Sequence, residues 1–223
     1  MGWPFASGLR KHDQFVGAGL VPARFPFLLP HLRGKAGMGG STHNNQPTDN
    51  NMANFNQAFE KMIQNEGGYR LHQVPNDRGG MTYTGISRKF HPDWPGWKPL
   101  DRGDLDNPEM ASMVREFYRA KYWDRISGDG IQNQAIAETL FDFAVNAGYR
   151  TAIKLAQIIA GSTPDGIMGP KTLEALNRFP GEDFSLRFAL AKIARYAEIV
   201  RRDPGQHKFL LGWINRTLKG VVA

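Results

Sequence analysis

Apolar side chains recur from Met52 onward at the three- and four-residue intervals of an α-helix, and Gly and Pro residues separate one stripe from the next. Each such helix buries one face, so a chain of this kind forms its core from packed helices. Strand signals are few, and the best is the short alternating run from Met81 to Ser87, between Gly79-Gly80 and the next helices. The sequence therefore predicts a mainly α-helical fold with a small β-hairpin.

Seven segments are expected to be helical. The apolar stripes of the first three are Phe55, Ala58, Phe59, Met62 and Ile63; Met110, Met113, Val114 and Phe117; and Ile136, Leu140, Phe143 and Ala147. Asn107-Pro108-Glu109 opens the second of these helices, because a capping side chain precedes Pro and an acid, and Gly148 ends the third. Further helices are expected over residues 151–160, 170–178, 184–202 and 208–219.

The amino-terminal part differs from the rest. Residues 1–51 are rich in Gly and Pro, and their most apolar run, from Phe15 to Leu29, is interrupted by Pro22, Arg24 and Pro26. A secretory signal or a membrane span needs a continuous apolar run. We therefore expect residues 1–51 to be a disordered tail or an upstream extension rather than a functional basic arm. We expect no stable membrane insertion, and a cytoplasmic location until a holin-like pore or another export route releases the protein.

Composition limits the possible chemistry and partners. The chain has no Cys, which excludes disulfides, thiolate zinc sites and a cysteine nucleophile. Its 28 Lys and Arg against 21 Asp and Glu give a net charge of +7, which favours an anionic partner such as nucleic acid, acidic lipid or an anionic cell-wall polymer. Neither paired metal-binding histidines nor a phosphate loop is present, so no metal and no cofactor are expected.

Glu66 is the first candidate for catalysis. It follows the first apolar stripe directly and precedes Gly67-Gly68, so its carboxyl group meets the negative end of the helix dipole beside apolar neighbours. Both effects raise a carboxyl pKa, and a carboxyl group that keeps its proton near neutral pH suits a general acid for glycosidic cleavage. The alternative is a structural Glu bonded to a neighbouring backbone group or to Arg70.

Three polar residues downstream of Glu66 are candidates for the same site. Asp77 lies in a turn sequence, and Thr82 and Thr84 are two apart on the expected strand, which places them on one face. These side chains would surround a sugar and a water molecule. For Asp77 the alternative is an Asx-turn that caps its own loop.

The motifs Glu66-Gly67-Gly68-Tyr69, Asn76-Asp77 with Gly79-Gly80, and Thr82-Tyr83-Thr84-Gly85-Ile86-Ser87 resemble glycoside hydrolase family 108. This family contains phage-type endolysins and secretion-activator muramidases with a lysozyme-like helical fold. The resemblance implies that Glu66 is the catalytic acid and that the substrate is the β-1,4 bond between N-acetylmuramic acid and N-acetylglucosamine. It supports Asp77, Thr82 and Thr84 less directly, because their spacing matches the Glu, Asp, Thr arrangement of other phage lysozymes only loosely.

The second half carries another resemblance. Residues 140–148 (LFDFAVNAG), Ala156-Gln157 and Asp165-Gly166-Ile167-Met168-Gly169-Pro170-Lys171-Thr172 are similar to the peptidoglycan-binding region that accompanies this family. The expected role of the Asp165 loop is structural, with the carboxylate held by free N–H groups of the helix that starts at Pro170. Asn146 shares a helix face with Glu138 and Asp142, which favours either a sugar contact or ordinary solvated surface.

Aromatic residues add to the case for saccharide binding, since flat rings suit pyranose faces. Tyr69 follows the Glu66 motif directly, and Trp94 and Trp97 lie in a Pro- and Gly-rich stretch where they are expected to cover a cleft. Trp123 and Trp213 are expected in the core.

These predictions combine into one organisation. Residues 52–139 are expected to form a glycoside hydrolase region and residues 140–223 a helical peptidoglycan-binding region packed against it. Glu66 would protonate the glycosidic oxygen, with Asp77 or a water held by Thr82 or Thr84 completing the reaction; an inverting path needs about 6.5 to 9.5 Å between the carboxyl groups. The expected partner is the glycan strand of peptidoglycan, with no nucleic-acid partner. The alternatives are a non-catalytic wall-binding protein and a basic nucleic-acid binder.

Overall fold

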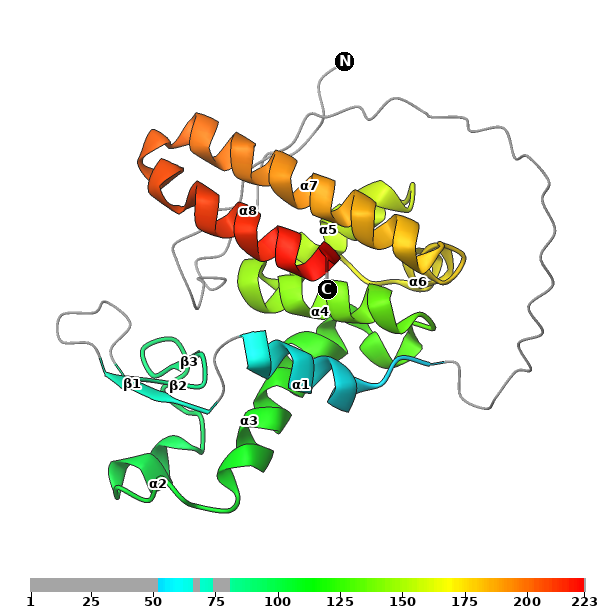
Figure 1. Ribbon diagram of the computed structural model, residues 1–223. Coiled ribbons are helices and arrows are strands. Elements are labelled where there is room, and N and C mark those ends of the chain that lie inside the picture. Colours follow the sequence, from blue (N-terminus) through cyan, green and yellow to red (C-terminus); the bar gives the residue numbers. More distant parts are fainter. Residues whose placement is uncertain (1–51, 66–68, 74–80, 223) are drawn as a thin grey trace, which may run out of the picture.

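The computed structural model describes residues 52–65, 69–73 and 81–222, and within them the chain is mainly α-helical (Figure 1). The predicted lysozyme-like helical fold with a small β-hairpin is confirmed. The helices are α1 (Phe55–Asn65), α2 (Trp97–Asp101), α3 (Met110–Tyr118), α4 (Gln134–Ala147), α5 (Tyr149–Ile159), α6 (Pro170–Asn177), α7 (Gly181–Arg202) and α8 (His207–Val222). The strands are β1 (Leu71–Gln73), β2 (Met81–Tyr83) and β3 (Ile86–Ser87).

All seven expected helices are present. The helix that was missed is α2, which lies in the Pro- and Gly-rich stretch and is only five residues long. Between α3 and α4 the chain also forms a π-helical turn over Arg119–Trp123 and two short 3-10 turns, Asp124–Ile126 and Gly128–Gly130. Turns of this length carry too few residues to show a helical period in the sequence.

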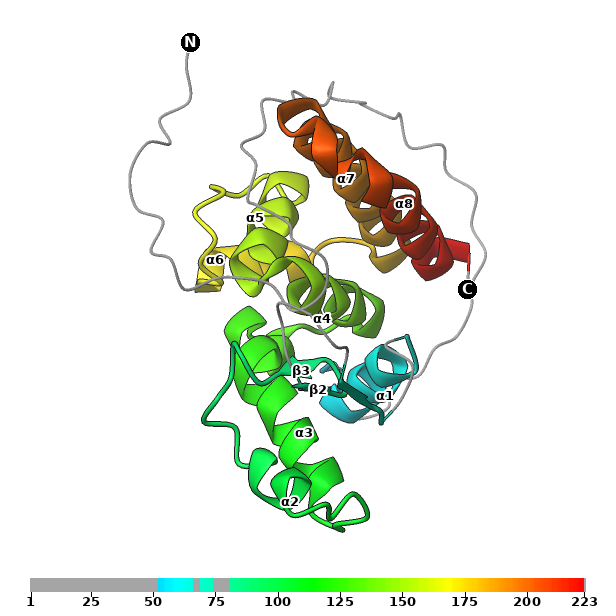
Figure 2. The same ribbon diagram turned by 90° about the vertical axis from the view of Figure 1, so that its left-hand side faces the viewer.

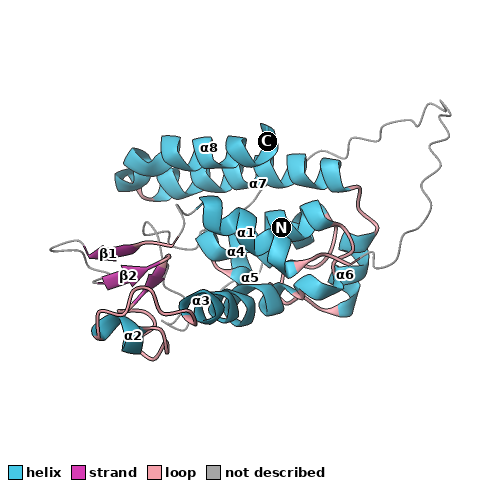
Figure 3. Cartoon of the chain, turned by 60° about the horizontal axis from the view of Figure 1, so that its bottom comes forward, coloured by secondary structure: helices cyan, strands magenta, loops and turns pink. Residues whose placement is uncertain are grey.

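The sheet is antiparallel in the order β1-β2-β3. The expected hairpin is β2 with β3, where Tyr83 pairs with Ile86. Its turn uses two positive-φ residues, Thr84 at 47° and Gly85 at 79°. The third strand, β1, was not predicted; its Leu71 pairs with Tyr83. Figure 3 shows the strands at one end of the molecule, beside α2 and away from α6.

The core lies around α4, which packs against α1, α5 and α7 (Figure 2). Aromatic rings join the first part of the chain to this helix: Phe55 lies 5.4 Å from the ring of Trp123 and 5.9 Å from that of Phe141. All three rings are buried, and the indole N–H of Trp123 donates to Asp129 at 2.7 Å. This cluster fixes α1 against α4, and α1 leads toward the candidate catalytic residue.

Helices α7 and α8 form an antiparallel pair that lies across α4 and α5 in Figure 1. Phe184 and Phe188 of α7 are buried, and Phe188 packs edge-on against Phe143 of α4 at 5.5 Å. On the other side of the pair, Tyr196 packs against Trp213 of α8 at 5.2 Å. None of the helices in the described ranges is both long and apolar enough to cross a membrane.

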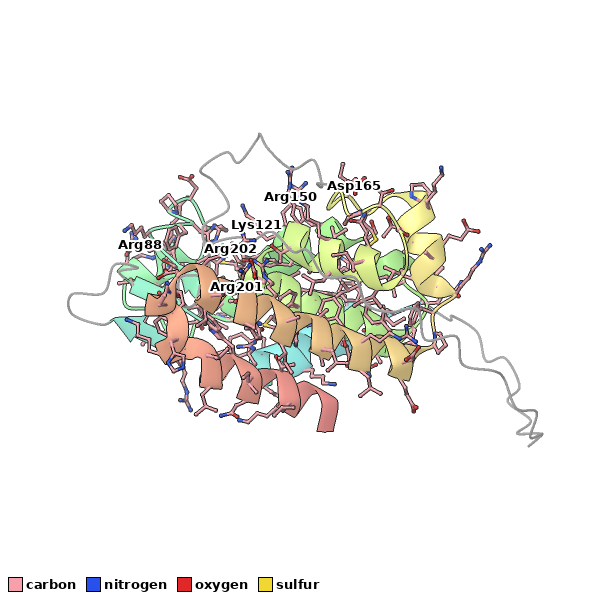
Figure 4. The ribbon with its side chains drawn as sticks, turned by 90° about the horizontal axis from the view of Figure 1, so that it is seen from above. Arg88, Lys121, Arg150, Asp165, Arg201 and Arg202 are labelled. Carbon is pink, nitrogen blue, oxygen red and sulfur yellow. The ribbon has the colours of Figure 1, made fainter. Side chains whose placement is uncertain are left out.

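The loop between α5 and α6 is built around Gln157, which is 1% exposed. Its Nε2 donates to Asp165 Oδ1 at 2.7 Å and to the carbonyl oxygen of Ile167 at 3.0 Å, while its Oε1 accepts the backbone N–H of Gly166. The carboxylate of Asp165 also accepts the N–H of Ile167. The prediction that N–H groups of the helix starting at Pro170 hold this carboxylate is therefore wrong. These bonds lower the pKa of Asp165. Figure 4 shows Asp165 and Arg150 along the same edge of the molecule.

The predicted division of the chain places a boundary between residues 139 and 140, which falls inside α4. Helix α4 ends at Gly148, whose φ of 80° starts α5 at the next residue. Residues 1–51, for which a tail or an extension is expected, lie outside the described residues.

Candidate active site

Helix α1 leads directly to the candidate catalytic residue. Its apolar stripe is buried as predicted, with Phe59 and Met62 at most 1% exposed, and it ends at Asn65, one residue before Glu66. Glu66 and Asp77 both lie outside the described residues. The described part of the candidate site consists of the end of α1, the sheet that follows, and the face of α3 beside them.

Arg115 of α3 holds α1 in place. Its guanidinium donates to Asn56 Oδ1 at 2.7 Å and to Glu60 Oε1 at 2.8 Å, and it lies 4.7 Å from the centre of the Phe59 ring. Sequence reasoning missed Arg115, although it directly follows Val114 of the inner face of α3. A basic residue flanking an apolar stripe was the signal for such a contact.

Tyr69 lies near the same ion pair. It is 43% exposed, and partial burial together with the negative charge of Glu60 raises the pKa of its phenol, while Arg115 has the opposite effect. Tyr69 follows Glu66 by three residues and is accessible from solvent. A contact of its ring with a sugar stays a prediction.

The two threonines occupy different environments. Thr82 lies in β2 and is half-buried, paired with Ser87 of β3. Thr84 is 2% exposed and lies in the turn, with its left-handed backbone conformation beyond the end of β2 at Tyr83. Because β2 ends before Thr84, the alternation of side chains along the strand does not reach this residue. The two threonines therefore do not share one face of a strand.

Tyr118 of α3 holds the β2–β3 turn in place through a hydrogen bond. Its buried hydroxyl donates to the carbonyl oxygen of Thr84 at 2.8 Å, and the N–H of Thr84 donates to the carbonyl oxygen of Arg70 at 2.9 Å. Gly85 gives room for this contact, because a Cβ at that position would lie 2.6 Å from the Tyr118 hydroxyl oxygen. The sequence does not indicate this role for Tyr118, since a buried tyrosine at the end of an apolar stripe resembles any other core residue.

Asn146 lies on a face of α4 that contacts other helices. Glu138 of that face pairs with Lys61 of α1 at 3.0 Å, and Asp142 pairs with Arg216 of α8 at 3.0 Å. The side-chain amide of Asn146 donates to the backbone carbonyl of Asp142 at 2.7 Å. This face is therefore half-buried between helices, and the role of Asn146 as a sugar contact stays a prediction.

Two tryptophans expected to cover a cleft are part of the core. Trp94 is 6% exposed and Trp97 is 3% exposed, and their rings pack edge-to-face at 5.0 Å. The indole N–H of Trp94 donates to the carbonyl of Met113, and that of Trp97 donates to the carbonyl of His91. The prediction was wrong because α2 turns the Pro- and Gly-rich stretch back over α3 and buries both rings.

The elements around the candidate residues follow one another in the chain. Helix α1 ends one residue before Glu66, and the sheet with Thr82 and the turn with Thr84 come later in the chain. The exposed Tyr69 lies between α1 and β1 in the sequence. Among the described residues, no three His, Asp or Glu side chains come together in a way that could hold a metal ion.

Two stretches of the chain match known families. Residues 59–148 match the family model for glycosyl hydrolase 108, and residues 151–218 match the model for a predicted peptidoglycan domain. Among solved structures, SagA of Brucella abortus is similar, with a TM-score of 0.55 and 24% identity over 75% of this chain and 91% of that chain. This likeness shows a shared fold. No curated protein matches the chain.

The two family matches follow one another along the chain and together extend from within α1, through the sheet, to within α8. The first match contains Glu66, Asp77 and both threonines, and the second begins within α5. The chain therefore carries a region that matches glycosyl hydrolase 108, followed by a predicted peptidoglycan domain, and this combination supports a peptidoglycan hydrolase.

Proposed function

We propose that this protein is an N-acetylmuramidase that cleaves the β-1,4 bond between N-acetylmuramic acid and N-acetylglucosamine in peptidoglycan. The observation that carries the proposal is the position of Glu66, inside the glycosyl hydrolase 108 match and one residue beyond the buried helix α1. The fixed end of α1 supports a catalytic role for the next side chain, because a general acid must be held close to the bond that breaks.

In the proposed reaction, Glu66 donates its proton to the glycosidic oxygen as the bond from that oxygen to the anomeric carbon breaks. In one case the carboxylate of Asp77 stabilises the positive charge that develops on the sugar, and water then adds to the anomeric carbon and gives a proton back to Glu66. In a second case a water molecule held by Thr82 or Thr84 attacks the anomeric carbon directly. In the second case Asp77 takes the proton of that water. Tyr69 and Asn146 are proposed to contact the sugar rings.

The biological setting of this activity is also a proposal. A cell-wall hydrolase of this type acts either as a phage-type endolysin or as a secretion activator, and both roles need the enzyme to reach the cell wall in the periplasm or envelope. The division into a hydrolase region, residues 52–139, and a peptidoglycan-binding region, residues 140–223, assigns cleavage to the first and retention on the wall to the second.

A second candidate is a peptidoglycan-binding protein without catalysis. The match of residues 151–218 to a predicted peptidoglycan domain favours binding in either case. The two candidates differ in whether glycosidic bonds are broken, so a test of the products separates them.

The deciding experiment is the Glu66→Gln substitution in the full chain. Removing the acidic proton should lower the rate of muropeptide release at least about 100-fold, since general acid catalysis contributes a factor of this order. Released fragments are measured by mass spectrometry with reducing-end analysis for muramic acid, and NMR of the first-formed anomer gives the stereochemistry.

The matched control is Glu109→Gln, the same chemical change on an exposed carboxylate at the start of α3. It should release fragments at the wild-type rate, and both variants should keep the helical circular-dichroism signal. Undiminished cleavage by Glu66→Gln would exclude Glu66 as the acid, and no fragments from the wild-type protein would favour the binding protein.

A further inference from the structure

A half-open hollow of about 780 Å³ lies at the opposite end of α1 from Glu66. We call it the amide groove, because six of its lining residues carry side-chain amides. Its lining consists of Met52, Ala53, Asn54, Gln57, Asp129, Gln132, Asn133, Gln134, Asn177 and Phe179.

The amide groove is a rigid part of the fold, because several elements meet there. Gln134, the first residue of α4, accepts the N–H of Asn54 at 2.6 Å and donates to the carbonyl oxygen of Asn54. Asn177, the last residue of α6, accepts the N–H of Gln132 at 2.9 Å and donates to the carbonyl oxygen of Gly130. Helix α7 begins there too, and a Cβ at Gly181 would collide with the side chain of Asn133.

Several amides of this groove are oriented and still able to bind. Asn54 and Asn133 cap α1 and α4, since their Oδ1 atoms accept the N–H groups of Gln57 and Ile136 at 3.2 Å. Capping fixes the oxygen of each amide, and in the described part of the chain their Nδ2 groups make no hydrogen bond. The side chains of Gln57 and Gln132 are exposed and add both donors and acceptors.

The charge of the lining indicates what kind of ligand fits. Asp129 is the single ionised residue among the ten, and it is engaged by Arg119 and by the indole of Trp123. Of the described residues, no Lys, Arg or His lines the hollow itself; Arg119 beside it is paired with Asp129 and Arg187 lies over the ring of Phe179. The lining therefore offers little to compensate the charge of a phosphate or carboxylate. Amide side chains pair instead with neutral hydroxyl and acetamido groups. The half-buried ring of Phe179, with that guanidinium lying over it, adds an apolar edge to the hollow.

The position of the groove links the two matched regions. Asn54 and residues 129–134 surround it from the side of α1 and α4, while Asn177 and Phe179 come from the predicted peptidoglycan domain. Helix α1 runs from the groove toward Glu66, and its 11 residues span about 16 Å at 1.5 Å per residue. A polymer of sugars is long enough to occupy both ends of this helix.

We propose that the amide groove binds a neutral, N-acetylated stretch of the glycan strand, outside the place where the bond is cleaved. The inference rests on the proposed function, since it takes the ligand to be the same polymer. Acetamido carbonyl oxygens accept hydrogen bonds from the amides of Asn54 and Asn133, and sugar hydroxyls pair with Gln57 and Gln132.

The test uses the full chain with Glu66→Gln, to prevent turnover, and an N-acetylglucosamine hexasaccharide as the probe. Adding Gln57→Ala and Gln132→Ala should weaken binding of the probe about tenfold by calorimetry, because two hydrogen bonds of typical strength are lost. In the chain that carries Glu66→Gln alone, the probe should shift the NMR signals of the side-chain amides of Gln57 and Gln132. A bulky Gln132→Trp change should weaken binding in the same direction.

The matched control is Asn215→Ala, which removes an exposed amide of α8 that does not line the groove. It should leave the dissociation constant as it is. Equal affinity in the Gln57→Ala, Gln132→Ala protein and the control would overturn the proposal, as would binding of the free stem peptide without binding of the hexasaccharide. Cleavage of peptidoglycan by the Glu66→Gln chain would overturn the role of Glu66 in the proposed function and leave the groove result standing.

Discussion

Single residues in this protein show how a buried charge is tolerated. Lys192 of α7 is 7% exposed, and its ammonium group lies 5.5 Å from the centre of the Phe143 ring. Burial lowers the pKa of Lys192, and the carboxylate of Asp142 opposes this effect. Asp142 also pairs with Arg216, so one carboxylate balances two basic groups from two helices.

This arrangement predicts opposite outcomes for two substitutions. Asp142→Asn should lower the free energy of unfolding by about 2 kcal/mol, because it removes a charged hydrogen-bond partner and leaves the two cations facing each other. Lys192→Met should leave the free energy of unfolding unchanged or raise it, since a buried charge is replaced by an apolar side chain of similar length. Urea unfolding of both variants measures the difference; a larger loss for Lys192→Met would show that its charge is a net stabilising group.

At the scale of elements, the β2–β3 turn depends on a helix that follows it in the chain. The turn needs a positive φ at Thr84 and Gly85, and the hydroxyl of Tyr118 holds it to α3. Because the candidate Thr82 and Thr84 belong to this hairpin, the contact with α3 sets their position relative to α1.

The turn predicts a double-mutant cycle. Gly85→Ala should destabilise the protein by more than the roughly 1 kcal/mol expected from backbone strain alone, since the added methyl group meets the Tyr118 hydroxyl. In a Tyr118→Phe background that hydroxyl is gone, so the cost of Gly85→Ala should fall toward the strain alone. Thermal unfolding of the four proteins gives the coupling, and strictly additive losses would contradict the close contact.

The elements that the sequence predicted well are those with long apolar stripes. Helices α1 and α4 bury the faces that their spacing indicates, because a stripe of several turns has only one way to cover its apolar side. Helix α2 and strand β1 were missed because each is too short for a period to show. Trp94 and Trp97 were misplaced because the sequence does not show which helix will cover a loop.

At the scale of the whole molecule, the net charge of +7 bears on attachment to the wall. Figure 4 shows basic side chains on one face, with Lys121 near the middle and Arg201 and Arg202 at the end of α7. Arg201 and Arg202 pair with Glu198, which reduces their effect at a distance. The basic charge is therefore spread over several elements and partly compensated.

Salt should affect two kinds of binding differently. Retention on intact sacculi, which carry carboxylates, should fall as sodium chloride rises from about 0.05 to about 0.5 M, because attraction between exposed charges is screened. Binding of the neutral hexasaccharide should not change over this range, since none of the described residues that line the amide groove is basic. Cosedimentation and calorimetry measure the two, and salt-independent retention on sacculi would contradict a role for the net charge.

The candidate site could be predicted from the sequence only as far as its motif extends. Glu66 was selected because an apolar stripe, two glycines and a tyrosine surround it, all within a few positions. The amide groove could not be found in this way, because Asn54, Asn133 and Asn177 are far apart in the chain and come together only when α1, α4 and α6 pack. A single Asn before a helix indicates a cap and nothing about a ligand.

Gly148 ends one helix and starts the next without an intervening linker. The hydrolase match is therefore connected to the peptidoglycan match through two consecutive, packed helices. This connection differs from that in enzymes whose wall-binding modules are attached by flexible linkers. In such a molecule the fold fixes the distance between the amide groove and the far end of α1. If a glycan strand is bound at the amide groove, the bond that is cleaved should lie at a constant distance from the bound sugars. The length of α1 would then determine where along the polymer the cuts are made.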